Sequence, residues 1–256
     1  MNSKNPFSLI DKTILITGAS SGIGQGIAIA CAGQGAKVLL MGRNVERLEE
    51  TVQLCANGLG HAYFSVDLQQ VGGWQEELTA FLKAHAPIQG FVHAAGISPT
   101  IPLKVMKSQQ MLDCFQLNVF SAVQLIQLIT KPGIKSPEGM SVVLISSVMS
   151  EAGEKGKSLY AMTKAALVAL VKSLALEYAE KRIRFNAVSP AVVDTPLSLG
   201  SHYRKEEEAM REVLKQHPLG LGSAADVGNA SVFLLSEASR WVTGTNLIVD
   251  GGYLAR

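Results

Sequence analysis

Charge is scarce in this sequence of 256 residues. Asp, Glu, Lys and Arg make up 17% of the chain, against about 25% in an average soluble domain. The 23 basic and 21 acidic residues leave a formal net charge of +2, which excludes the strongly basic surface that nucleic acids and anionic membranes attract. A surface with so little charge also favours a chain that is partly covered by other subunits.

Long hydrophobic runs and paired cysteines are missing too. The longest uninterrupted apolar run covers only residues 165–171, whereas a helix that spans a bilayer needs about 20 apolar residues. The N-terminus carries no signal-peptide core. Cys31, Cys55 and Cys114 lie far apart, and neither they nor the 5 histidines have the spacing of a metal site. We therefore expect a cytoplasmic chain with no metal, no membrane contact and buried, reduced thiols.

Apolar runs rich in β-branched residues alternate with Ala- and Leu-rich stretches of helical character. The runs lack strict polar alternation, which is typical of parallel strands covered on both faces. We therefore expect one doubly wound α/β domain over residues 1–256, with a parallel seven-stranded sheet and helices on both faces. The expected strands are 12–17, 36–41, 61–66, 89–93, 141–146, 182–188 and 245–249. The first expected helix ends near residue 34, and the others cover 45–55, 111–130, 159–181 and 224–235.

One segment near the C-terminus breaks this alternation. Residues 198–221 contain a charged helical stretch between two Pro-containing loops, and an insertion of this kind is typical of a substrate lid. We expect the lid at 195–222. Its first residues and the segment 97–103 are apolar with a few hydroxyls, which suits a ketone with an aliphatic part.

A glycine-rich turn, TGASSGIG at residues 17–24, follows the first expected strand and opens the first helix. Its glycines, Gly18, Gly22 and Gly24, do not have the G-x-G-x-x-G spacing. They still permit positive φ angles and let backbone N–H groups approach a pyrophosphate at the positive end of a helix. The alternative is a purely structural turn with a serine N-cap.

The second expected strand indicates which dinucleotide would bind. A carboxylate near its end would accept hydrogen bonds from the ribose 2′-OH of NAD, but residues 37–45 contain no acid at the strand end, where Arg43 stands instead. A guanidinium suits a 2′-phosphate, so NADP(H) is favoured over NAD(H). An ordinary surface arginine is the alternative.

A candidate proton-transfer group lies further along. Tyr160 and Lys164 are four residues apart at the start of an expected helix and so share one face. A neighbouring cation lowers the pKa of a tyrosine, which lets it exchange a proton with a substrate oxygen. A surface pair with the lysine stem along the helix is the alternative. Ser147 closes the fifth expected strand, at the edge where open α/β sheets bind ligands.

Further motifs accompany these residues in a fixed order. They are Asp67-Leu68, Ala95-Gly96, Asn118 in LNVF, Ser189-Pro190 with Thr195, and the ending VDGG at residues 249–252. With this set the whole chain resembles the classical short-chain dehydrogenase/reductase family, and within it the 3-oxoacyl-carrier-protein reductases. The resemblance implies a Rossmann-type fold, a homotetramer and NADP(H)-dependent reduction of a ketone, either a carrier-bound 3-oxoacyl thioester or another small carbonyl compound, to a secondary alcohol.

The resemblance also implies roles for single residues. Tyr160 would be the general acid in reduction, or the base in oxidation, and Ser147 would polarise the carbonyl oxygen. Lys164 would hold the nicotinamide ribose and lower the tyrosine pKa, while Asn118 would position a water that links Lys164 to solvent. The implied cofactor-binding residues are Gly18, Ser20, Ser21, Gly22, Ile23, Gly24, Arg43, Asp67, Leu68, Ala95, Gly96, Tyr160, Lys164, Pro190, Val193 and Thr195.

The sequence departs from the family pattern at two places. The usual Asn-Asn-Ala-Gly reads HAAG at residues 93–96, so an amide that braces the sheet is missing, and the usual Pro-Gly reads Pro190-Ala191. Both bear on cofactor affinity rather than on proton transfer. His93 could be read as a catalytic base, but we prefer a strand-end imidazole bonded to a backbone group.

Two other functions stay open on these residues. One is an NAD-dependent alcohol or hydroxysteroid-type dehydrogenase that works in the oxidative direction. The other is a non-enzymatic, dinucleotide-binding regulator, against which the intact set of Ser147, Tyr160 and Lys164 argues.

Overall fold

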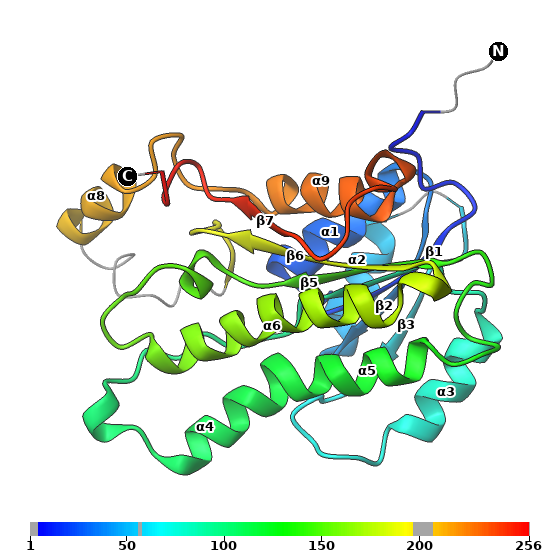
Figure 1. Cartoon of the computed structure of the whole chain (residues 1–256), viewed down its shortest axis with the longest axis horizontal. Helices are drawn as coiled ribbons and strands as arrows, with labels where there is room; N and C mark the ends of the chain where they lie inside the picture. The colour runs from blue at the N-terminus through cyan, green and yellow to red at the C-terminus, as the bar shows by residue number, and fades with distance from the viewer. Residues whose placement is uncertain (1–4, 56–57, 197–206, 256) are drawn as a thin grey trace.

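The seven strands found in the described residues join one parallel sheet. The computed structural model describes residues 5–55, 58–196 and 207–255, and its strands lie in the order β3-β2-β1-β4-β5-β6-β7 (Figure 1). The order reverses between β1 and β4, which is where doubly wound sheets bind ligands at the carboxyl ends of their strands. The strands are β1 (Thr13–Thr17), β2 (Lys37–Gly42), β3 (Ala62–Ser65), β4 (Gly90–His93), β5 (Met140–Ile145), β6 (Ile183–Pro190) and β7 (Asn246–Val249).

Helices cover both faces of this sheet, so the predicted Rossmann-type α/β architecture is confirmed. The helices α1 (Gly22–Gly33), α2 (Val45–Leu54) and α9 (Ala224–Leu235) lie on one face. The helices α3 (Gln75–Ala84), α5 (Ser121–Ile129) and α6 (Ser158–Glu177) lie on the other (Figure 1). Successive residues of β1 enter opposite cores: Leu15 packs on the second face, and Ile14 and Ile16 pack on the first. This double burial explains why the strands show no polar alternation.

Several predicted helices differ from the observed ones. The helix expected at 111–130 is present as the stretch Ser108–Ile129 but contains an irregular turn: α4 (Ser108–Phe115) leads into a π-helical turn, η2 (Gln116–Phe120), and then into α5. The helix expected to reach residue 181 ends at Glu177 and is followed by a 3-10 turn. The helix α3 was not predicted, although its buried Leu78 and Leu82 have helical spacing. The remaining elements are α8 (Glu207–Lys215) and the 3-10 turns η1 (Leu103–Val105), η3 (Val148–Ser150), η4 (Ala179–Lys181) and η6 (Glu237–Ser239).

Two helical stretches are long and apolar enough to cross a membrane by length and composition alone, Ser108–Ile129 and Ser158–Glu177. Both contain residues of the core on one face of the sheet, and core helices of soluble proteins pass the same test. Their burial is incomplete, however: 56% of the apolar window of the first and 33% of that of the second is buried. Much apolar surface on α6 therefore stays uncovered in the isolated chain.

The three cysteines are buried and unpaired, as predicted. Burial raises the pKa of the Cys31 thiol, and it raises that of Cys55 to about 11, so both stay protonated at neutral pH. Within the described part of the chain, no group of three or more His, Cys, Asp or Glu side chains is placed to hold a metal ion.

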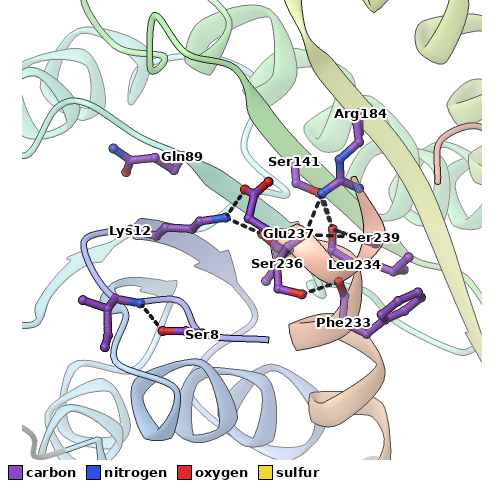
Figure 2. A network of polar contacts seen from close by, with 12 residues as sticks. Ser8, Lys12, Gln89, Ser141, Arg184, Phe233, Leu234, Ser236, Glu237 and Ser239 are labelled. Atoms are coloured by element: carbon purple, nitrogen blue, oxygen red, sulfur yellow. Dashed lines mark hydrogen bonds and ion pairs between the residues drawn. The ribbon is translucent and has the colours of Figure 1, made fainter. Parts of the chain in front are cut away.

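The sheet also satisfies the last carbonyl groups of α9, which a helix cannot pair by itself. The Arg184 guanidinium on β6 donates to the carbonyl oxygens of Leu234 at 2.8 Å and Ser236 at 3.3 Å. The Ser141 hydroxyl on β5 donates to the Leu234 oxygen as well, at 2.7 Å. Figure 2 shows these side chains converging on the end of the helix. They hold α9 against β5 and β6.

Replacing this guanidinium should therefore destabilise the fold. We expect Arg184→Met to lower the free energy of unfolding by about 1–3 kcal/mol, because it removes the hydrogen bonds of a charged donor to the Leu234, Ser236 and Val242 carbonyl groups. Urea denaturation measures this change. The exposed Arg240, in Arg240→Met, serves as the control, and equal stability of the two variants would contradict the assignment.

Candidate active site

A cleft opens where the strand order reverses, at the carboxyl ends of β1, β2 and β4. It encloses about 920 Å³ of space that is partly open to solvent. Most of the predicted cofactor residues line it, whereas Tyr160, Lys164, Pro190 and Val193 lie outside its lining. The predicted residues in the lining are Gly18, Ser20, Ser21, Gly22, Ile23, Gly24, Arg43, Asp67, Leu68, Ala95, Gly96 and Thr195.

The glycine-rich turn between β1 and α1 has no room for side chains. Gly18 has a φ of +66°, and a Cβ there would lie 2.8 Å from the backbone nitrogen of Ala95. A Cβ on Gly24 would collide with the carbonyl oxygen of Gly18. Ser21 precedes α1 in an extended conformation, but its side chain makes no capping hydrogen bond. This argues against the structural, serine-capped turn and leaves the first-turn N–H groups of α1 available to an anion such as a pyrophosphate.

Arg43 lies directly after β2, beside this turn. Its side chain is exposed and lines the cleft, and a Cβ on the preceding Gly42 would lie 3.3 Å from the Ser20 side chain. No carboxylate occurs at the end of β2. The carboxylate of Asp67, which follows the neighbouring strand β3 and also lines the cleft, accepts from the backbone nitrogen of Gln69 at 3.0 Å. The cleft therefore presents a cation where the ribose 2′ position of a dinucleotide is expected.

The Thr17 hydroxyl joins the end of β1 to the end of β4. It accepts hydrogen bonds from the backbone nitrogens of Ala94 and Ala95, both at 3.1 Å. Both of its acceptor positions are thus used, so its proton is donated to the His93 Nδ1, also at 3.1 Å. This arrangement assigns the single N–H proton of a neutral imidazole to Nε2.

His93 is buried at this junction and is a bracing group rather than a base. Its Nε2 lies 3.5 Å from the Ser121 hydroxyl, which donates to the Leu117 carbonyl at 2.6 Å. Burial, with help from the Lys164 charge, lowers the pKa of His93 to about 3. The imidazole thus supplies a brace where the usual amide is missing. The expected backbone partner is Leu117, and the hydroxyls of Thr17 and Ser121 flank the two nitrogens as well.

Asn118 lies in the π-helical turn η2 and is fully buried. Its Oδ1 accepts from the Ile97 nitrogen at 2.9 Å, and its Nδ2 donates to the Ile97 carbonyl and to the Thr163 hydroxyl, both at 3.0 Å. The side-chain amide is therefore engaged by the loop after β4 and by α6. A Cβ on Gly96 would lie 3.0 Å from the Asn118 Oδ1 and 3.6 Å from the Lys164 Nζ, so both side chains reach the same small space. Single π-helical turns of this kind are frequent at functional sites.

Tyr160, Lys164 and Ser147 come together beside the carboxyl end of β5. The Lys164 Nζ is buried, donates to the Ile145 carbonyl at 2.8 Å and lies 5.5 Å from the centroid of the Tyr160 ring. Ser147 follows β5, and its hydroxyl accepts from the Met149 nitrogen at 3.2 Å. The alternative of a surface Tyr–Lys pair is excluded by the burial of Lys164.

The pKa of Tyr160 differs from our expectation. Burial raises it to about 12, and a hydrogen bond with Ser147 opposes the increase. Burial thus outweighs the lowering of the tyrosine pKa that we expect from the Lys164 ammonium. Burial lowers the pKa of Lys164 itself to about 8. In this state the tyrosine holds its proton at neutral pH, as a general acid requires.

Comparison with known proteins identifies the family in which this arrangement of residues occurs. A family model described as enoyl-(acyl carrier protein) reductase matches residues 18–254. The 3-oxoacyl-[acyl-carrier-protein] reductase FabG of Chlamydia pneumoniae is 31% identical over 247 residues, which cover 96% of this chain and 98% of the relative. The chain belongs to the short-chain dehydrogenase/reductase family. As a short-chain dehydrogenase/reductase it is an oxidoreductase that acts on CH–OH or C=O groups with a nicotinamide dinucleotide.

Two further relatives differ in what they act on. The 2-dehydro-3-deoxy-D-gluconate 5-dehydrogenase of Bacillus subtilis is 34% identical over 252 residues, covering 98% of this chain and 97% of the relative. The crystal structure of a 3-oxoacyl-(acyl-carrier-protein) reductase from Agrobacterium tumefaciens C58 with NADP bound has a TM-score of 0.89 at 28% identity, covering 99% of this chain and 98% of that one. This short-chain dehydrogenase/reductase thus resembles enzymes with both acyl and sugar-acid substrates.

The buried His93 should make the stability depend on pH. Its pKa of about 3 lies below the ordinary 6.5, so between these values the unfolded chain takes up a proton that the folded protein refuses. The stabilising contribution is present above pH 6.5 and is lost as the pH falls toward 3. Between pH 7 and pH 5 the loss from this residue is about 2 kcal/mol.

Urea unfolding of the wild type and of His93→Asn at both pH values measures this loss. We expect the fall in stability from pH 7 to pH 5 to be about 2 kcal/mol smaller in the variant. His61 and His85, whose pKa values are also lowered, contribute equally to both proteins. An equal fall in the two proteins would mean that His93 titrates normally.

Proposed function

We propose that this short-chain dehydrogenase/reductase reduces a ketone to a secondary alcohol with NADPH. The observation that carries the proposal is the buried Lys164 ammonium on the face of Tyr160, beside a glycine-rich turn that is shaped for a pyrophosphate. A phenol that keeps its proton and a serine hydroxyl next to it suit the protonation of a carbonyl oxygen.

The bound nicotinamide supplies the hydride that reduces the carbonyl carbon. Tyr160 donates the proton that the carbonyl oxygen takes up, and the Ser147 hydroxyl donates a hydrogen bond to the same oxygen. The buried Lys164, whose pKa is lowered to about 8, holds a proton next to the phenol and binds the ribose hydroxyls. Asn118 joins the loop after β4 to α6 and positions a water that links Lys164 to solvent. The same residues serve the reverse oxidation, with Tyr160 as the base.

The preference for NADP(H) rests on Arg43 and on the missing carboxylate at the end of β2. The relative from Agrobacterium tumefaciens that contains NADP supports it. We assign the pyrophosphate to residues 18–24, the 2′-phosphate to Arg43, and the adenine to Asp67 and Leu68. Ala95, Gly96, Pro190, Val193 and Thr195 complete the site around the nicotinamide half.

We also propose that residues 195–222 form a substrate lid on this one domain of residues 1–256. The base of the segment is closed by two backbone hydrogen bonds, from Asp194 to the Gly222 carbonyl at 2.8 Å and from Gly222 to the Val192 carbonyl at 3.0 Å. The helix α8 belongs to the segment, while 197–206 lie outside the described residues. A loop whose ends are joined can move as a unit over a site.

We further propose a cytoplasmic homotetramer. The uncovered apolar surface of α6 supports it, with Met162 at 47% and Leu176 at 84% exposure, as does Phe120 in the η2 turn at 45%. The runner-up functions are an NAD-dependent alcohol or hydroxysteroid-type dehydrogenase and a non-enzymatic dinucleotide-binding regulator. The first would prefer NAD(H), and the second would bind a dinucleotide without turnover.

The variant Tyr160→Phe tests the chemistry. We expect it to bind NADPH with unchanged affinity but to lose at least about 100-fold in kcat for ketone reduction, because the general acid is gone and the ring is kept. Fluorescence titration measures the binding, and NADPH oxidation at 340 nm measures the turnover. Full activity in this variant would refute the proposed role.

The variant Arg43→Ala tests the cofactor preference. We expect it to weaken NADPH binding about 10- to 100-fold, because charge-assisted hydrogen bonds to the 2′-phosphate are lost, and to leave NADH binding nearly unchanged. The exposed Arg47 on α2, in Arg47→Ala, is the matched control. An equal effect of Arg43→Ala on both dinucleotides would contradict the assignment.

A further inference from the structure

A second lysine, Lys157, lies against the Tyr160 ring and has no part in the mechanism above. Its Nζ is 5.8 Å from the ring centroid, almost as near as that of Lys164 at 5.5 Å. Lys157 directly precedes α6 and Lys164 lies in its second turn, so a cation stands on each side of the tyrosine in the sequence. The proton-transfer chemistry uses only one of them.

The loop after β4 holds this second ammonium in place. The Lys157 Nζ donates to the Ser98 hydroxyl at 3.1 Å and to the Ser98 carbonyl at 3.4 Å. The two segments are also joined by a backbone hydrogen bond from Ile101 to the Gly156 carbonyl at 2.8 Å. Ser98 belongs to the segment that the sequence predicts to face the substrate. The ammonium thus lies between the proton donor and this segment.

Lys157 has no ion-pair partner among the residues that the structure describes. Its side chain is half-buried. Glu154 is the acid whose charge acts on it, but that residue is exposed. Burial lowers the pKa of Lys157, because a cation away from water is costly unless an anion accompanies it. A neutral hydrogen-bond donor would join Lys157's loop to Ser98 equally well, so a bridging role alone does not require a charged side chain here.

We infer that Lys157, together with Ser98, binds a carboxylate of the substrate, so that the ketone reduced is that of an oxo acid. The inference rests on the proposed function, since it takes Tyr160 as the group that protonates the carbonyl. The carboxylate accepts hydrogen bonds from the Lys157 ammonium and the Ser98 hydroxyl. It thereby orients the carbonyl toward Tyr160 and selects against uncharged ketones.

Matched substrates separate the charge from the carbonyl. We would measure NADPH-dependent reduction of 3-oxobutanoate and 5-oxohexanoate, and of the methyl ester of each, by the wild-type enzyme. The expected result is a higher kcat/KM for at least one acid than for its ester. In Lys157→Met the acid-to-ester ratio of kcat/KM should fall about 10- to 100-fold, the value of one charge-assisted hydrogen-bonded contact.

Two control variants distinguish binding of the anion from a structural role. Lys157→Arg keeps the charge and should retain the acid preference. Lys155→Met removes an exposed lysine of the same loop and should leave the acid-to-ester ratio at its wild-type value. Thermal denaturation and NADPH titration of each variant show whether it is folded. A structural role would lower both rates together without changing their ratio.

The possible failures are distinguishable. If the esters are reduced as well as the acids by the wild type, or if Lys157→Met leaves the ratio unchanged, the inference on Lys157 is overturned and the ketone-reductase proposal stands. If neither acids nor esters are reduced with NADPH, the reductase proposal itself fails, and the inference fails with it.

Discussion

The Thr17 hydroxyl is the contact on which the geometry of the cleft depends. It accepts from two backbone nitrogens of the loop after β4 and donates to His93, so all three hydrogen-bonding positions of this buried hydroxyl are used. The same residue ends β1 and begins the glycine-rich turn. The distance between the phosphate-binding turn and the loop after β4 is therefore fixed by one buried atom. Gly18, whose Cβ would collide with that loop, reflects the same close approach.

The constraint continues from the cofactor cleft to the proton-transfer residues. The His93 ring contacts the Ser121 hydroxyl, which donates to the carbonyl of Leu117 in the π-helical turn. Asn118 in that turn is hydrogen-bonded to Ile97 on one side and to Thr163 on the other. Thr163 directly precedes Lys164 on α6. A chain of buried hydrogen bonds thus connects the turn that would hold the pyrophosphate to the lysine under Tyr160. Each link is satisfied at both ends, which is what gives a buried polar network a single geometry.

Much of this arrangement can be read from the sequence, because it depends on local patterns. The apolar runs predict the parallel sheet, and the glycines predict a turn with close backbone approach. The spacing of Tyr160 and Lys164 predicts that their side chains lie together. The parts that were missed depend on partners distant in the chain. Packing that no single segment encodes determines three features. These are the π-helical turn at 116–120, the hydroxyls on both sides of His93, and the raised pKa of Tyr160. Thr17 and Thr163 could have been suspected, since each directly neighbours a predicted site residue.

Replacing Thr17 by the isosteric valine tests this account most directly, with NADPH affinity and kcat for ketone reduction measured on the same protein. If the hydroxyl fixes both halves of the site, Thr17→Val loses about tenfold or more in each quantity, while Thr17→Ser, which keeps the hydroxyl, retains both. A valine variant that stays folded and keeps wild-type affinity and rate, or that loses only one of them, would contradict the claim that this junction couples the cofactor cleft to the catalytic residues.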